Sequence, residues 1–308
     1  MGKLNVLSLC DGISCGQVAL KRLGVKEKDM NYYASEIADY SIKITMKNHP
    51  NTIQIGDMTK LNNEQLDDIG DIDLLLSGTP CKSLSCTNTK NYEQGLDGSS
   101  KLFWDFVRIK NYVEPKYFLY ENVESMKDSD RDIITEALGV NPVVIDSADF
   151  SAQDRKRYYW TNIPIPEITN KCNATLKDIM IDNPDEKLFY KQDFEFRGWD
   201  KKHIATLKLK CHDIGKRVYN PNMKCATLTA VTGGYQEKKV YDNGRCRKLT
   251  PLEYERLQTL PDNYTEGVAN SKRYCGCGDG WTVDVIVHIL RGIENELLKG
   301  DIHEVQSM

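Results

Sequence analysis

An apolar run that stops abruptly at a glycine-proline loop constrains the fold of this chain more than any other stretch. Leu74 to Leu76 predicts a buried strand, and Ser-Gly-Thr-Pro at 77–80 ends it, because glycine and proline interrupt regular structure. Ligands of parallel α/β sheets bind beyond the carboxyl ends of the strands, so Cys81 is placed for chemistry. One cysteine among ten is more often a small buried hydrophobe, but Pro80 and the small polar residues after Cys81 favour a reactive loop.

Three earlier strand ends each carry an acidic residue. An apolar run precedes each acid, and a glycine turn and a helix over residues 17–23 follow the first. Any one of these acids is more often a helix N-cap than a ligand contact. Three in succession favour a nucleotide-like cofactor, with the second acid on a ribose diol. The acids are Asp11 after residues 4–9, Glu36 after 31–35 and Asp57 after 52–55.

Two further polar groups follow the cysteine loop. A strand over 117–120 ends at Glu121-Asn122-Val123, where a buried acid would hold the edge of a base; the alternative is another helix cap. Gln153, Arg155 and Arg157 precede an aromatic strand at 158–160, and at least one guanidinium there should point inward instead of lying on a solvated face. The polar segment 86–100, which has no apolar period, predicts a lid.

The chain is long enough for one α/β domain and a smaller partner. Its 308 residues predict a Rossmann-like, mixed but mostly parallel sheet with a smaller, irregular, mainly β domain. Prolines at 164, 166 and 184 mark the change, and a helix begins at Thr250-Pro251, an N-cap followed by proline at the first helical position. We expect a catalytic domain at 1–163 and 271–308 and a target-recognition domain at 164–270.

The charge distribution predicts a nucleic-acid partner. The net charge is −4, yet the segment from Arg197 to Lys248 holds 13 Lys and Arg against 4 Asp and Glu. This local excess of +9 is the expected footprint of phosphate binding, with Lys201 and Lys202 as candidate contacts. The ten cysteines show no repeated metal-ligand spacing, so we expect no metal and reduced thiols in a cytoplasm. No signal peptide or membrane segment is expected.

In chain order, these residues resemble the motifs of the C5-cytosine DNA methyltransferase family over nearly the whole length. The matching elements are the Asp-Gly-Ile turn and Gly16, Glu36, Asp57, Pro80-Cys81, Glu121-Asn122-Val123, Gln153-x-Arg155-x-Arg157 and the helix motif from Arg247 to Gln258. The stretches 9–16 and 151–160 resemble the animal de novo branch and its phage and bacterial relatives. Three positions depart from the family pattern, namely Ile37, Lys82 and Asp279.

The resemblance implies S-adenosylmethionine as methyl donor and three groups of site residues. The catalytic group is Cys81, Glu121, Arg155 and Arg157. The cofactor group is Leu9, Asp11, Gly12, Ile13, Gly16, Glu36, Ile37, Asp57, Met58, Pro80, Leu102, Trp281 and Val283. The group that contacts the nucleic acid is Lys82, Ser85, Asn122, Thr229, Gly233 and Gly234.

The activity implied is methylation of C5 of a flipped-out cytosine in a specific sequence of double-stranded DNA. Cys81 would add to C6, Glu121 would contact N3, Arg157 would contact O2, and Arg155 would support the loop. The expected protein is a monomer in a bacterial or phage-infected cell, acting in restriction-modification or in the protection of phage or host DNA. The alternatives are a catalytically silent DNA-binding homologue and an RNA methyltransferase of the same family, although the Cys-Phe-Thr element of that branch is absent.

Overall fold

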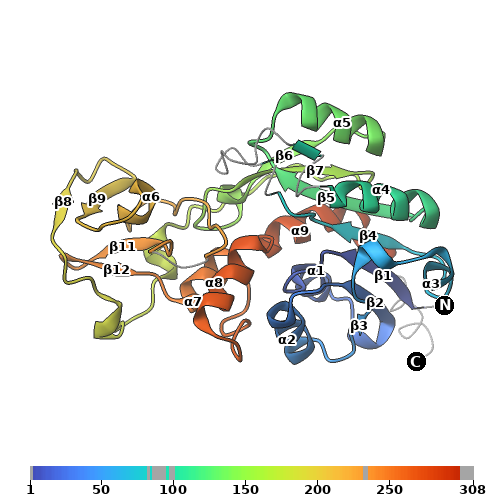
Figure 1. Ribbon diagram of the computed structural model, residues 1–308, viewed down its shortest axis with the longest axis horizontal. Helices are drawn as coiled ribbons and strands as arrows, with labels where there is room; N and C mark the ends of the chain where they lie inside the picture. The colour runs from blue at the N-terminus through green and yellow to red at the C-terminus, as the bar shows by residue number, and fades with distance from the viewer. Residues whose placement is uncertain (1–2, 82–83, 85–94, 97–100, 232–234, 299–308) are drawn as a thin grey trace. The chain divides into compact units, whose positions relative to one another are not determined.

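The computed structural model describes residues 3–81, 84, 95–96, 101–231 and 235–298, and these form two compact units (Figure 1). The first unit contains residues 1–145, 156–167 and 286–308, and the second contains 146–155 and 168–285. The domain boundaries expected from the sequence, after 163 and at 271, stay a prediction. None of the helices in these ranges is both long and apolar enough to span a membrane.

A seven-stranded sheet in the order β3-β2-β1-β4-β5-β7-β6 forms the centre of the first unit. Neighbours from β3 to β5 are parallel, whereas β7 runs antiparallel to β5, so the sheet is mixed and mostly parallel, as predicted. The strand order reverses direction at β1, which is where α/β sheets bind ligands. The strands are β1 (Leu4–Leu9), β2 (Met30–Ser35), β3 (Ile53–Gln54), β4 (Leu74–Ser77), β5 (Tyr117–Val123), β6 (Val143–Asp146) and β7 (Lys156–Thr161).

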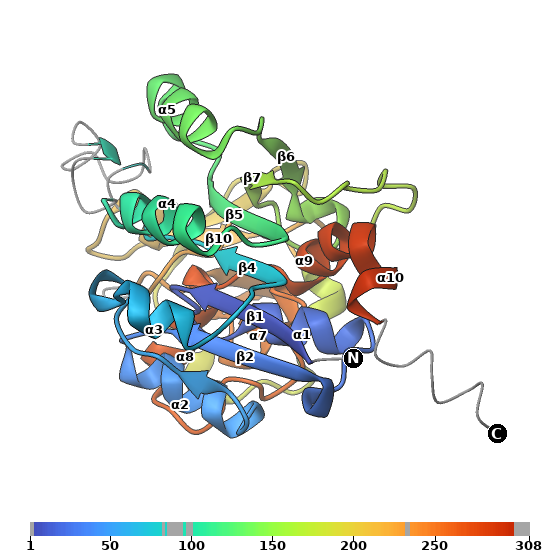
Figure 2. The same cartoon turned by 90° about the vertical axis from the view of Figure 1, so that its right-hand side faces the viewer.

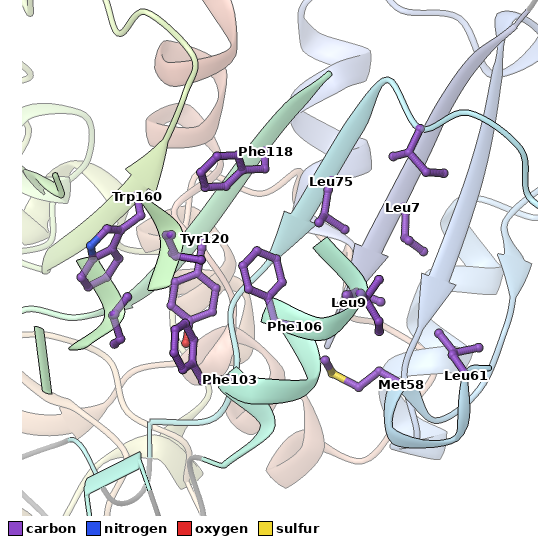
Figure 3. Packing of buried hydrophobic residues seen from close by; sticks show 14 of the residues in the cluster. Leu7, Leu9, Met58, Leu61, Leu75, Phe103, Phe106, Phe118, Tyr120 and Trp160 are labelled. Atoms are coloured by element: carbon purple, nitrogen blue, oxygen red, sulfur yellow. The ribbon is translucent and has the colours of Figure 1, made fainter. Parts of the chain in front are cut away.

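Helices cover this sheet, with α4 and α1 on opposite sides of it (Figure 2). Their bounds are α1 (Cys15–Arg22), α2 (Asp39–Asn48), α3 (Asn63–Asp67), α4 (Leu102–Val113), α5 (Asp128–Leu138), α9 (Val283–Leu290) and α10 (Glu294–Leu297). Alternate residues of β1, such as Leu7 and Leu9, join Leu75 and Tyr120 in packing against Phe103 and Phe106 of α4 (Figure 3). Gly24 has φ +96° directly after α1, so it ends that helix as its sequence position predicts.

A five-stranded sheet in the order β12-β11-β10-β9-β8 lies in the second unit. Its small core contains Ile204, Leu207, Val218 and Cys246. The helix α7 begins as predicted, with Thr250 as N-cap, Pro251 in the first turn and a capping box to Glu253. The elements are β8 (Phe194–Phe196), β9 (His203–Leu207), β10 (Arg217–Tyr219), β11 (Lys239–Asp242), β12 (Arg245–Lys248), α6 (Asp213–Lys216), α7 (Pro251–Leu257) and α8 (Asn270–Asp279).

Three sequence expectations differ from the observed elements. Glu121 to Val123 belong to β5 instead of ending it, because antiparallel pairing with β7 sets Glu121 opposite Tyr159 and Val123 opposite Arg157. The Ala-Thr-Leu-Thr sequence at 226–229 predicts a short β-like run, but these residues lie outside the strands, next to an isolated bridge between Gln153 and Cys225. The apolar sequence 281–290 predicts a helix from Trp281, and the helix begins at Val283.

Candidate active site

The turn after β1 is closed by the acid that follows β2. Glu36 accepts a hydrogen bond from the backbone N–H of Gly12 at 2.8 Å and two more from Ile37 and Ala38 at 2.7 and 2.8 Å. Gly12 has φ +60°, and no atom lies within 4 Å of where its Cβ would be, so the turn leaves open space beside the backbone. A carboxylate has about four acceptor positions, so Glu36 can accept one more donor from a ligand.

Asp11 and Asp57 are held by hydroxyl groups at the neighbouring strand ends. Asp11 accepts from the hydroxyls of Ser14 and, at 2.7 Å, Tyr32, while burial raises the pKa of its carboxyl group to about 6. Asp57 accepts from the backbone N–H and the hydroxyl of Thr59, and these bonds lower its pKa. All three acids therefore make the helix-cap or turn hydrogen bonds that were the alternative to ligand binding. They nevertheless lie together at one edge of the sheet.

The pKa of the Cys10 thiol indicates that this edge of the sheet has a negative electrostatic potential. Burial raises the pKa of the Cys10 thiol to about 12, and four carboxylates raise it further in the same direction. The thiol donates to the sulfur of Met58 at 3.3 Å, and Met58 is itself buried. The carboxylates are those of Glu36, Asp57, Asp105 and Asp11. The negative potential that suppresses the thiolate would favour a ligand that carries positive charge.

The remaining residues predicted for the cofactor are divided between the two units. Leu9, Ile13 and Gly16 are buried, Pro80 is exposed, Leu102 is half-buried, and Ile37 is 72% exposed; all belong to the first unit. Trp281 and Val283 belong to the second unit, so their assignment to this site stays a prediction. Val283 is fully buried there and its N–H donates to the carbonyl of Gln258 at 2.9 Å.

The loop that carries Cys81 is attached on both sides of the thiol. Before it, the Thr79 hydroxyl lies 2.6 Å from the hydroxyl of Tyr120, and Asn122 donates to the Thr79 carbonyl at 3.3 Å. After it, the Cys81 carbonyl accepts from the N–H of Leu84 at 3.0 Å, and Leu84 is fully buried in the core. Cys81 itself is half-buried and packs against the same cluster of apolar side chains. The thiol thus lies just beyond the end of β4.

Glu121 and Arg157 form an ion pair between adjacent strands. The Arg157 Nε lies 2.9 Å from Glu121 Oε1, with both side chains nearly buried. The residues come together because the β5–β7 register sets Arg157 opposite Val123, two positions from Glu121 and on the same face. The sequence predicted that at least one guanidinium of this run points inward or pairs, and the structure shows that the side chains of both Arg155 and Arg157 are largely buried.

Arg155 is a buried connector in the second unit. Its guanidinium donates to the carbonyls of Leu228, Gly278 and Gly280 at 2.9 to 3.1 Å. Gln153 acts similarly, accepting from the N–H of Leu228 and donating to the carbonyl of Leu257. The expected role of Arg155 in supporting the catalytic loop and its place in the catalytic group stay predictions.

Of the residues predicted to contact nucleic acid, Asn122 and Thr229 are described. Asn122 is buried and faces the Thr79 loop, so in this structure its amide serves the loop. Thr229 is exposed in the second unit. Lys82, Ser85, Gly233, Gly234 and most of the expected lid at 86–100 lie outside the described residues. In the parts of the chain that are described, no three His, Cys, Asp or Glu side chains are arranged to hold a metal ion.

Sequence reasoning missed several residues of this site. Cys10 and Asp105 belong to the acidic edge, Thr79 belongs to the thiol loop, and Tyr120 of β5 is hydrogen-bonded to that loop. Asp105 lies in the first turn of α4, three positions after Leu102, a spacing that would have placed it near a predicted cofactor residue. The other three each adjoin a predicted site residue in the sequence, but the bond between Thr79 and Tyr120 depends on pairing between strands that are distant in sequence.

Comparisons with known proteins cover almost the whole chain. A family model described as C-5 cytosine-specific DNA methylase matches residues 4–295. The orphan methyltransferase M.SPBetaI of Bacillus phage SPbeta is 24% identical, over 94% of this chain and 97% of that protein. The type II methyltransferase M.HhaI of Haemophilus parahaemolyticus is 25% identical, over 96% of this chain and 95% of that protein.

Solved structures share the fold. The Entamoeba histolytica methyltransferase EhMeth has a TM-score of 0.72 at 16% identity, with 96% of this chain and 99% of that chain covered. The S. pombe Dnmt2 methyltransferase has a TM-score of 0.68 at 17% identity, with the same coverage. At these identities the likeness shows a common fold.

Proposed function

Because the chain belongs to the C-5 cytosine-specific DNA methylase family, we propose that it methylates C5 of cytosine in a specific sequence of double-stranded DNA. The single observation that carries this proposal is the convergence of a half-buried thiol loop, a buried Glu-Arg pair and an acidic cofactor edge at one end of the first unit's sheet. We further propose that the protein acts as a monomer in the bacterial cytoplasm, modifying or protecting phage or host DNA.

The acidic edge fits the family's methyl donor, S-adenosylmethionine. Gly12 leaves open space beside the turn, and Glu36 retains acceptor capacity for a ribose hydroxyl. Asp11, Glu36, Asp57 and Asp105 together favour positive charge, which the donor carries on its sulfonium and ammonium groups. When bound, the donor supplies an electrophilic methyl group on a positively charged sulfur.

Cys81 would activate the base covalently. Its thiolate adds to C6 and forms a sulfur–carbon bond, so that the electron pair of the C5–C6 double bond becomes available at C5. C5 then takes the methyl group, and the bond between that group and the donor sulfur breaks. Loss of the C5 proton to water re-forms the C5–C6 double bond, and the bond between Cys81 and C6 breaks with its electron pair left on sulfur, which restores the aromatic base and the thiolate.

Glu121 and Arg157 would orient the base during this addition. Glu121 would bond N3 and draw electron density away from C6, and Arg157 would contact O2, as the family resemblance implies. The 2.9 Å pair between them supports this, because it fixes the carboxyl group at a known place on β5. C6 is inaccessible inside a duplex, so the cytosine would have to be flipped out.

Covalent trapping tests the proposal. Duplex DNA that carries 5-fluorocytosine at the target should form a stable adduct with the protein and donor, because fluorine at C5 cannot leave as the proton does. Cys81→Ser should form no adduct and transfer no methyl group while binding the donor within about twofold of wild type, since the thiolate acts only in the chemical step. Denaturing gels measure the adduct, radiolabelled donor measures methyl transfer, and calorimetric titration measures donor binding.

The matched control is Cys172→Ser, which changes another partly exposed thiol far along the chain. It should retain trapping and turnover. Turnover by Cys81→Ser would refute the assignment of Cys81 as the nucleophile. If wild type binds DNA but forms no trapped adduct, the catalytically silent alternative is favoured. Parallel assays on single-stranded RNA address the RNA alternative, and bisulfite sequencing of DNA from expressing cells would give the target sequence.

A further inference from the structure

The buried hydroxyl of Tyr120 reaches from β5 to the loop that carries the nucleophile. Tyr120 is fully buried, and its oxygen lies 2.6 Å from Thr79 Oγ1, two residues before Cys81. Asn122 donates to the same Tyr120 oxygen at 3.1 Å. Either hydroxyl can donate in the bond between Tyr120 and Thr79, and together with Asn122 they form one chain of hydrogen bonds. Burial also raises the pKa of Tyr120 well above its usual value, so its hydroxyl remains protonated.

The Tyr120 ring cannot easily change its position. Its centroid lies 4.8 Å from that of Phe106, 5.4 Å from Phe103 and 5.8 Å from Trp160, and Figure 3 shows it enclosed by these rings. Close-packed aromatic groups of this kind resist displacement. The hydroxyl is therefore a fixed point, and the loop is attached to it.

The attachment has a direct path to the thiol. Only Pro80, with its restricted φ, separates Thr79 from Cys81. The Asn122 amide adds a second bond to the Thr79 carbonyl, and its own oxygen accepts from the N–H of Val123 at 2.9 Å, which orients the amide. On the other side of the thiol, the N–H of Leu84 donates to the Cys81 carbonyl at 3.0 Å.

We propose that the Tyr120 hydroxyl, acting through Thr79, is a positioning group that sets the distance and direction from which the Cys81 sulfur attacks. The inference deepens the proposed function and rests on it. Tyr120 does not touch the reacting atoms; it acts on the chemical step by holding the loop. Loss of the hydroxyl should therefore slow attack without weakening donor binding, because the acidic edge is built from other residues.

Tyr120→Phe removes the hydroxyl and keeps the ring. We expect the single-turnover rate of methyl transfer to fall by roughly tenfold to a hundredfold, the range for a small misplacement of a reacting group, with the donor Kd unchanged within twofold. Thr79→Val should match this loss and Thr79→Ser should restore most of the rate. The double variant Tyr120→Phe/Thr79→Val should be no slower than either single variant, because both break one chain of bonds.

The matched control is Tyr112→Phe, which removes a hydroxyl that donates to Asp67 on the exposed surface of the same unit. It should leave the rate unchanged. An unchanged rate in Tyr120→Phe, or additive losses in the double variant, would overturn the proposal. Loss of donor affinity in parallel with the rate would also overturn it, since that pattern indicates general disruption of the fold.

A readout that needs no methyl transfer separates this proposal from the proposed function. Alkylation of Cys81 by iodoacetamide, followed by mass spectrometry with the other thiols as internal references, should become at least threefold faster in Tyr120→Phe and stay unchanged in Tyr112→Phe. If wild type transfers no methyl group to any nucleic acid, the proposed function fails while this comparison still tests the attachment. An unchanged alkylation rate in Tyr120→Phe would refute the attachment even if methyl transfer is demonstrated.

Discussion

Burial and hydrogen bonding act in opposite directions on the carboxyl group of Asp11. Burial is the larger effect and raises the pKa, whereas hydrogen bonds from Ser14, Ser8 and Tyr32 lower it, and the charge of Glu36 raises it again. The result of about 6 lies well above the usual value of an aspartate. Asp11 therefore changes charge close to neutral pH, at a site that favours a cation.

Donor affinity should depend on this ionisation. Below pH 6 Asp11 is neutral, and above it the carboxylate attracts the positively charged donor, so the donor should bind more tightly as pH rises from 5 to 7. We expect a gain of roughly threefold to tenfold, the effect of about 1 kcal/mol of charge interaction. Calorimetric titration at several pH values measures it, and proton release on binding should peak near pH 6.

The control is Asp11→Asn, whose affinity should be nearly constant over the same pH range. Asp57 does not contribute to the rise in donor affinity between pH 5 and 7, because its bonds to Thr59 lower its pKa and keep it ionised over this range. A wild-type affinity that does not vary with pH, or the same variation in Asp11→Asn, would show that Asp11 is not the titrating group.

Helix α8 approaches the chain at Thr229 more closely than a side chain permits. A Cβ on Gly278 would lie 2.3 Å from the carbonyl carbon and oxygen of Thr229 and 2.5 Å from the nitrogen of Ala230. This backbone contact lets the single guanidinium of Arg155 bond both Leu228 and Gly278. The glycine in this helix is thus required by packing, since its intrinsic helix propensity is poor.

Gly278→Ala should therefore destabilise the protein although alanine favours helices. The propensity gain is about 1 kcal/mol, whereas overpacking against backbone that cannot rotate away costs about 1–3 kcal/mol or more. We expect a net loss in the free energy of unfolding, measured by urea denaturation. Ser271→Ala, an exposed position in the same helix, should change stability by less than about 0.5 kcal/mol. An increase in stability in Gly278→Ala would show that the backbone at Thr229 and Ala230 moves aside at little energetic cost.

Periodicity and turn chemistry predicted most elements of the first unit, because strands and helices there are long and bounded by clear signals. The strand Leu4–Leu9 is an example, and in the second unit the capped start of α7 was predicted in the same way. The sequence could not show that β5 extends through Glu121, since that length depends on pairing with β7, which lies about 40 residues away. For the same reason it showed Cys81 but missed Tyr120: a nucleophile has a local signature, whereas its positioning group is defined only by the fold.

At the scale of the whole molecule, ion pairing reduces the number of cations in the basic segment that are available to bind phosphate. Of its 13 cationic side chains, six lie within 4 Å of a carboxylate, several of these outside the segment: Lys201, Lys202, Lys208, Arg217, Arg245 and Arg247. Lys224 and Lys239 donate to backbone carbonyls, and Lys238 is buried against Tyr219. Four of the six paired side chains contact acids outside the segment, namely Asp154, Asp193, Glu186 and Glu253, which lowers the local excess from +9 to +5. Lys202, paired with Asp154, is a poor phosphate contact.

Salt dependence of DNA binding should reflect the cations that remain. Lys210 and Lys216 have no acid within 4 Å in the described parts of the chain, and Lys210 is exposed. Lys210→Ala/Lys216→Ala should lower the slope of log K against log salt by about 1.8, that is 0.9 per phosphate contact, without changing the methylated sequence. Lys201→Ala/Lys202→Ala should have a smaller effect. Fluorescence anisotropy at several salt concentrations measures the slope for each double variant. A larger change in Lys201→Ala/Lys202→Ala than in Lys210→Ala/Lys216→Ala would assign the phosphate contacts to Lys201 and Lys202 instead.

The chain passes between the two units at 145/146, 155/156, 167/168 and 285/286. The excursion at 146–155 contributes Gln153 and Arg155, whose partners are Leu228, Leu257, Gly278 and Gly280. A recombination event that exchanged only residues 168–285 with a related gene would separate these partners from the donors that bind them. The 146–155 excursion, α7 and α8 should therefore be inherited together.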